Sequence, residues 1–121
     1  MPKRDGSLDT LLDLDGQSFV ISDQGYFVKF VVKRSPVTEA TPHGLSYSLT
    51  LHSKTGARLM GFDNAHAVRR TSGRLVEKVR VYDHVHRGSG DPGRPYRFDN
   101  AGKLIEDFWV EVERIMREEE R

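Results

Sequence analysis

The segment from Leu104 to Met116 constrains the fold more than any other part of the chain. Its apolar residues recur at helical spacing and form one wide stripe, while carboxylates occupy the opposite face. A stripe of this width needs cover, because burying each large apolar side chain contributes about 1.5–3 kcal/mol. The spacing predicts a long helix that is capped by Asp99 or Asn100, ends near Glu118 and packs on another layer. The stripe comprises Leu104, Ile105, Phe108, Trp109, Val112, Ile115 and Met116.

Alternating patterns before this helix predict strands. The clearest is Leu45–His52, where every second residue is apolar and the residues between are Ser, Thr or His. Turn residues at 22–25 and 53–56 join the first four strands into two hairpins. We therefore expect an α+β fold, with a twisted antiparallel sheet of about five strands (two hairpins plus one strand) packed by one long C-terminal helix. The expected strands are Gln17–Ile21, Tyr26–Arg34, Leu45–His52, Ala57–Phe62 and Leu75–His86, with an exposed loop over Asp63–Gly73.

Length and composition narrow the class of protein. The 121 residues suit one domain, with residues 1–7 as a disordered leader and residues 8–121 as a single α+β domain. Leu8–Asp15 is amphipathic and predicts one or two helical turns or the lead-in to a strand. The chain has no cysteine, which excludes disulfide scaffolds and thiolate zinc sites. No secretory signal and no apolar run of about 18 residues is visible, so we expect a cytoplasmic protein without a membrane partner.

Charge is unevenly distributed along the chain, although the net charge is only +1. The segment from His66 to Arg97 carries +5, and the segment from Phe98 to Arg121 carries −4. The middle of the chain could therefore attract a polyanion, while the tail could not. A solvated strand whose charges are neutralised by a neighbouring acidic helix would give the same distribution.

Two histidines in the segment Tyr82–Arg87 form the first candidate site. His84 and His86 are two residues apart, so on a strand they point to the same face. Paired imidazoles can cleave RNA, one taking a proton from a ribose 2′-hydroxyl and the other giving one to the leaving 5′-oxygen. Asp83 points to the other face of a regular strand and could orient a histidine only across a bulge. The pattern predicts catalysis by His84 and His86, with His66 and Asp83 in support.

Basic and aromatic side chains around this pair could hold a nucleic acid. Arg87, Arg94 and Lys78 could neutralise the charge that develops on phosphorus during cleavage. Tyr96 could add a stacking surface for a single strand, so RNA is the expected substrate. The expected nucleic-acid-binding residues are Arg87, Arg94, Arg97, Lys78, Arg80 and Tyr96.

Other interpretations of the same residues stay open. His84 and His86 could bind a divalent metal with Asp63 or His66 as a third ligand, although acid–base catalysis needs no cofactor. They could equally be surface histidines at the end of a strand. Asp63 and Asn64 could shape the site, or could only terminate a strand through their own backbone hydrogen bonds. The remaining expectations are that His43 and His52 have no role and that Trp109 lies in the core.

Four motifs occur in order along the chain. They are Gly61-Phe62-Asp63-Asn64-Ala65-His66, Tyr82-Asp83-His84-Val85-His86-Arg87, Arg94-Pro95-Tyr96-Arg97-Phe98 and Leu104-x-x-Asp107-Phe108-Trp109-x-x-Val112-Glu113. With these motifs the chain resembles the TumE-type toxin family from about Leu45 to Glu113. Ala67–Val81 separates the first two motifs, as in the longer-loop branch of that family.

This resemblance implies a toxin encoded beside a cognate DNA-binding antitoxin, such as a helix-turn-helix protein. It implies no particular chemistry, so the hypothesis of RNA cleavage rests on the histidines and the basic residues. The alternatives are a non-enzymatic toxin or binding module that blocks a cellular target by contact, and a metal-dependent nuclease. The acidic C-terminal helix is a further candidate for the antitoxin's docking site, because its charge opposes that of the basic segment.

Overall fold

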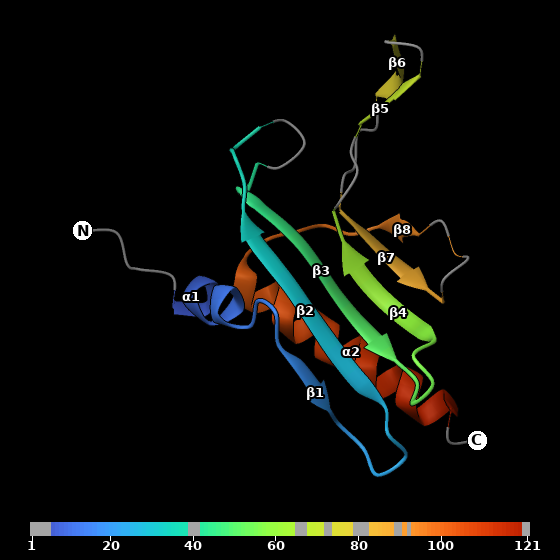
Figure 1. The fold of residues 1–121 in the computed structure, drawn as a ribbon. Coiled ribbons are helices and arrows are strands. Elements are labelled where there is room, and N and C mark those ends of the chain that lie inside the picture. The colour runs from blue at the N-terminus through green and yellow to red at the C-terminus, as the bar shows by residue number, and fades with distance from the viewer. Residues whose placement is uncertain are drawn as a thin grey trace.

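The structure is a computed structural model that describes residues 6–38, 42–64, 68–71, 74–78, 83–88, 91 and 93–119, and for 68–71 and 74–78 the backbone alone. Over these residues the chain forms one short helix, eight strands and one long helix, in that order (Figure 1). They are α1 (Gly6–Asp13), β1 (Ser18–Val20), β2 (Phe27–Arg34), β3 (Leu45–His52), β4 (Arg58–Asp63), β5 (Val68–Thr71), β6 (Arg74–Lys78), β7 (His84–Arg87), β8 (Arg94–Pro95) and α2 (Ala101–Glu119).

Six of the strands form one antiparallel sheet in the order β1-β2-β3-β4-β7-β8. Figure 1 shows α2 crossing one face of this sheet, with α1 beside the beginning of α2. The prediction of an α+β fold with one long C-terminal helix is confirmed. The sheet has six strands rather than about five, because Arg94 and Pro95 pair with Val85 and His84 as a short edge strand.

The core lies between the sheet and α2. Alternate residues of β2, β3 and β4 face the helix and are buried, and the register places Leu49 beside Phe62 and Phe30. The ring of Phe108 on α2 meets the rings of Phe30 and Phe62 edge-on at 5.5 and 6.0 Å. The helix therefore fixes one face of the sheet as the inner face. We call the opposite face, on which side chains alternate with those of the core, the outer face.

The segment between β4 and β7 differs from the sequence prediction. The loop expected over 63–73 contains β5, which pairs with β6 as a separate two-stranded sheet. The single strand expected over Leu75–His86 is two strands, β6 and β7, that belong to different sheets. The prediction was wrong because a period of two identifies the face of a strand but not its partner.

Two smaller differences concern α1 and Trp109. Leu8–Asp15 is mainly helical: α1 buries Leu11 completely and includes Gly6 and Ser7, the last two residues of the expected leader. Trp109 is 36% exposed rather than buried, because the apolar stripe of α2 is wider than the sheet that covers it.

Within the described part of the chain, no helix combines the length and the apolar character needed to cross a membrane.

Candidate active site on the outer face

The two histidines of the Asp-His-x-His motif lie together on the outer face. Val85 pairs with Phe62 on the inner face, so His84 and His86 on either side of Val85 point away from α2. Their ring centroids are 6.0 Å apart, and their planes are tilted by 44°. Opposite them on β4 stand Asp63, the partner of His84, and Gly61, the partner of His86.

The loop after β7 holds the ring of His86. Nδ1 of His86 lies 2.9 Å from the backbone oxygen of Asp91, and since a carbonyl oxygen can only accept, Nδ1 carries a proton. The carboxylate of Asp91 accepts hydrogen bonds from the backbone N–H groups of Gly93 at 2.8 Å and Arg87 at 2.6 Å. These bonds lower the pKa of Asp91 below its ordinary value. The Asp91 loop is therefore built around one orientation of His86.

Gly93 completes this loop by close approach. Its φ is +94°, and a Cβ atom at this position would lie 2.5 Å from Cε1 of His86. Only glycine allows the backbone to pass so close to the ring, and only glycine adopts this φ without strain. The spacing Asp91-x-Gly93 is a site feature that sequence reasoning missed, although turn residues directly after the histidine pair are its visible signal.

The other ring nitrogen of His86 faces a carboxylate. Nε2 lies 3.3 Å from Oδ2 of Asp63, and both side chains are largely buried. A neutral His86 with its proton on Nδ1 would present an unprotonated nitrogen to an ionised carboxylate, which is unfavourable. The contact is satisfied when the two groups share a further proton, on Nε2 of His86 or on Asp63. Nε2 of His86 and Oδ1 of Asp63 are both buried and have no hydrogen-bond partner among the described residues.

Access to the two rings differs. His86 is only 6% exposed, because Gly93 and Asp63 cover it, whereas His84 is half-buried. A substrate on the outer face therefore reaches His84 first, because Gly61, the partner of His86, is itself buried beside Thr50 and Arg58.

Asp83 lies on the other side of the sheet from the two rings. Its Oδ2 accepts a hydrogen bond of 2.5 Å from the hydroxyl of Tyr47 and lies 3.1 Å from Nε2 of His43. Nδ1 of His43 accepts a hydrogen bond from the N–H of Leu45, so a neutral His43 carries its proton on Nε2 and donates it to Asp83. Burial and the bond to Asp83 raise the pKa of Tyr47. In this arrangement Asp83 orients His43 and not His84 or His86.

The expectation that His43 has no role is corrected by these contacts. His43 lies 40 residues from Asp83 in sequence and its ring also packs against Phe98, with centroids 4.2 Å apart. No local pattern could have paired His43 with Asp83, because the pairing depends on the return of the chain to this edge of the sheet.

Asn64 bonds to the backbone of β3. Its Oδ1 accepts a hydrogen bond from the N–H of Tyr47 at 2.9 Å, and its Nδ2 donates to the oxygen of Leu45 at 2.7 Å. These bonds extend the pairing of β3 and β4 beyond the last strand residue, Asp63. The side chain thereby fixes the end of β4 that carries Asp63.

The expected phosphate-binding residues that the structure describes with side chains, Arg87, Arg94, Arg97 and Tyr96, do not gather around the histidines. Arg87 forms an ion pair of 2.6 Å with Glu118, and Arg94 one of 3.4 Å with Glu111, so both turn toward α2. Arg97 is almost fully exposed near Asp99. The hydroxyl of Tyr96 donates to Asp107 on α2. His66 and Arg80 lie outside the described residues, as does the side chain of Lys78 in β6.

No group of three or more potential metal ligands occurs among the residues that the structure describes. His84, His86 and Asp63 all belong to the described part, so as placed they do not form a three-ligand site. A metal at this position would need a ligand from elsewhere.

Comparison with known proteins identifies the family. The family model described as "Toxin TumE" matches residues 7–116, nearly the whole chain. The chain belongs to the TumE toxin family. No curated protein and no solved structure matches it.

Membership of the TumE family suggests a toxin of a toxin–antitoxin system, and with it an antitoxin as partner. The match includes all of α1 except Gly6, the six-stranded sheet, and all but the last three residues of α2. The histidine pair and the Asp91 loop both lie within the matched residues.

Proposed function

We propose that this TumE toxin cleaves RNA, with His84 and His86 as its acid–base pair. The observation that carries the proposal is the position of both rings on the outer face, 6.0 Å apart and away from α2. At this separation one phosphodiester can be within hydrogen-bond reach of a nitrogen on each ring once it is bound.

His84 acts as the general base in this proposal, because it is the more accessible ring. It takes the proton of a ribose 2′-hydroxyl, and the 2′-oxygen forms a bond to phosphorus. The bond from phosphorus to the 5′-oxygen breaks, and that oxygen takes a proton from Nε2 of a protonated His86, which lies beside Asp63. The products are a 2′,3′-cyclic phosphate and a 5′-hydroxyl end. Donation by His86 requires the substrate to displace the contact of Nε2 with Asp63.

The outer face offers a track for a single strand. The pairing register aligns Lys29, Thr50, Gly61 and His86 in one row across four strands. Three strand spacings separate Lys29 from His86, about 14 Å. Lys29 is exposed, whereas Thr50, Gly61 and His86 are buried, so a strand bound along this row reaches His86 only if the side chains over Gly61 move. The row supports binding of a phosphate at Lys29 and cleavage two or three nucleotides away.

Cleavage of RNA by the purified toxin in EDTA tests the proposal. We expect cuts with 5′-hydroxyl and cyclic phosphate ends, detected by end-specific labelling of the fragments. RNA that stays intact at high toxin concentration would contradict the proposal. Cleavage only after addition of a divalent ion would favour the metal-dependent alternative.

A contact inhibitor is the second candidate function. The observation that favours it is the pairing of Arg87 and Arg94 with glutamates of α2, because these two arginines then do not reach the histidines. A toxin that blocks its target by contact would keep partial toxicity when His84 and His86 are replaced by alanine. Each such substitution would cost about 1–2 kcal/mol of target affinity.

A further inference from the structure

The free edge of the sheet at β1 is bordered by exposed apolar side chains on both faces. Phe19, which is 42% exposed, contacts Phe30 on the inner face. Val20, which is 72% exposed, pairs with Phe27 and lies on the outer face. An edge strand with apolar residues on both sides is a template for another strand.

Backbone groups of β1 are oriented for such an addition. Gln17 accepts a hydrogen bond from Phe30, and Ile21 donates one to Tyr26, so the odd residues of this segment bond to β2. In an antiparallel pair, alternate residues bond to the partner strand, and the residues between them direct their N–H and C=O groups away from that strand. Ser18 and Val20 therefore present these groups to the free edge.

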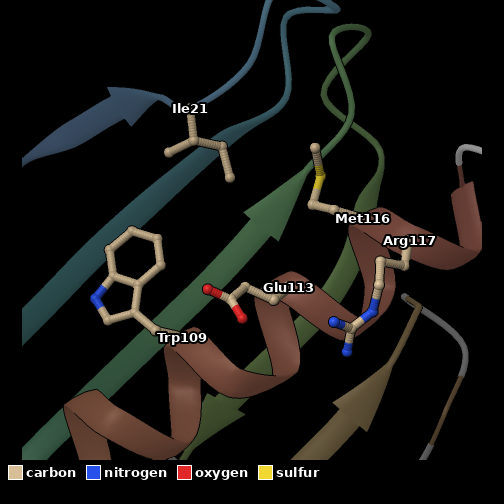
Figure 2. A pocket seen from close by; sticks show the side chains of 5 residues that line it. All are labelled: Ile21, Trp109, Glu113, Met116 and Arg117. Carbon is tan, nitrogen blue, oxygen red and sulfur yellow. The ribbon is translucent and has the colours of Figure 1, made fainter.

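A groove lies beside this edge, between Ile21 and α2 (Figure 2). Its volume is about 380 Å³, and its apolar lining consists of Ile21, Trp109 and Met116. Figure 2 shows Glu113 and Arg117 along the helix beside these three side chains. No ion pair links Glu113 or Arg117 to any other residue in the described ranges, whereas Glu111 and Glu118 are paired.

We propose that β1 and this groove bind an extended segment of the antitoxin as an added β-strand. Main-chain hydrogen bonds to Ser18 and Val20 supply affinity, and alternate side chains of the segment enter the groove. The groove residues predict the composition of the antitoxin segment. It should carry apolar residues against Ile21 and Trp109, a Lys or Arg opposite Glu113, and an Asp or Glu near Arg117. This inference rests on the toxin–antitoxin part of the proposed function and is independent of RNA cleavage.

A strand fits this surface better than a docked helix does. A helix in the groove would cover Trp109 and Met116 but would leave Val20, on the outer face, exposed. A strand added to β1 covers both faces of the edge and satisfies the backbone groups of Ser18 and Val20. The acidic charge of α2 as a whole contributes less, because Asp107, Glu111 and Glu118 are already paired within the chain.

Calorimetric titration with the purified protein encoded by the adjacent gene tests the proposal. Val20→Pro removes the N–H that points to the free edge and breaks no bond to β2. We expect it to weaken binding at least about tenfold, the effect of an interface hot spot. Val20→Thr, which keeps the N–H group and the branched side chain, is the matched control and should bind like the wild type.

Charge reversal provides a second test that leaves β1 intact. Glu113→Arg should weaken binding about fivefold, whereas Glu106→Arg, on the same helix two turns away, should not. Melting temperatures of all variants are compared with that of the wild type to exclude misfolding. Unchanged binding by both Val20→Pro and Glu113→Arg, or no binding by the wild type, would overturn the proposal.

Sedimentation of the toxin alone distinguishes another occupant of the edge. If the wild type is a dimer that Val20→Pro converts to a monomer, β1 pairs with a second copy of the chain and the proposal is wrong. A wild-type monomer that forms a one-to-one complex supports it. Because binding is the readout, failure of RNA cleavage would leave this result unaffected.

Discussion

Single residues decide the geometry of the histidine pair. His86 is fixed from three sides, by the backbone oxygen of Asp91, by the carboxylate of Asp63 and by the close approach of Gly93. His84 stands on the same strand and is the more accessible of the two rings. The orientation of His86 is therefore the part of the candidate site that is most sensitive to substitution.

Gly93→Ala should displace the ring of His86. Gly88 is the matched control, because it has a similar φ of +71° but a Cβ atom there would meet no other described atom within 4 Å. Gly88→Ala should cost only the backbone penalty, about 1–2 kcal/mol. Gly93→Ala should cost about 1–3 kcal/mol more, from the clash. Denaturant unfolding measures both; equal losses would show that the Gly93 contact is unimportant.

The buried hydroxyl of Tyr47 makes a second residue-scale prediction, for alkaline pH. Burial and Asp83 raise the pKa of Tyr47 above the ordinary value of 10.0, at which the unfolded chain ionises. Above pH 10 the unfolded chain loses the hydroxyl proton of this tyrosine, whereas the folded protein keeps it. The free energy of unfolding is therefore unaffected below pH 10 and decreases as the pH rises above it. The slope per tyrosine is at most about 1.4 kcal/mol per pH unit.

Tyr47→Phe should be less stable than the wild type at neutral pH, because Asp83 loses the hydrogen bond from the Tyr47 hydroxyl. It should also lose less stability per pH unit above about pH 10, because the phenyl ring does not ionise. Urea unfolding at several pH values measures both effects. Tyr96, whose pKa is raised by burial and by Asp107, leaves a residual slope in this variant. Parallel pH profiles for the variant and the wild type would contradict the prediction.

At the scale of elements, α2 determines the inner face of the sheet. Its apolar stripe covers this face, and its glutamates form ion pairs with Arg87 and Arg94, which lie on the same side of the sheet as Val85. Its start is defined by Asn100, whose Oδ1 accepts a hydrogen bond from the N–H of Lys103 at 2.8 Å. The sequence left Asp99 and Asn100 as equal candidates for this cap.

Replacement of the cap tests this assignment. Asn100→Ala should lower the free energy of unfolding by about 0.5–2 kcal/mol, because an N–H group of the first turn loses its partner. Asp99→Ala is the control and should change stability by less than about 0.5 kcal/mol, since the contact of Asp99 with Arg97, its one ion pair among the described residues, is exposed. Thermal unfolding followed by circular dichroism compares them. A larger loss for Asp99→Ala would assign the cap to that residue.

At the scale of the whole molecule, local sequence patterns predicted which face of a strand each side chain occupies. Long-range contacts decided which strands and which side chains pair with one another. Alternation placed His84 and His86 on one side and Asp83 on the other, because β7 is a regular strand. The same alternation places Arg87 on the face opposite the histidines. It could not show that Arg87 and Arg94 pair with glutamates of α2, since that depends on how the helix crosses the sheet. It also could not separate β6 from β7, or bring His43 to Asp83 across 40 residues.

The central claim concerns His84 and His86, and alanine substitution at each position tests it most directly. His52 is the control, a third histidine on the outer face whose ring stacks on Phe27. With one RNA substrate, His84→Ala and His86→Ala should each lose about 10²–10⁴-fold in cleavage rate, and His52→Ala should match the wild type. Cleavage at equal rates by all four proteins would contradict the account.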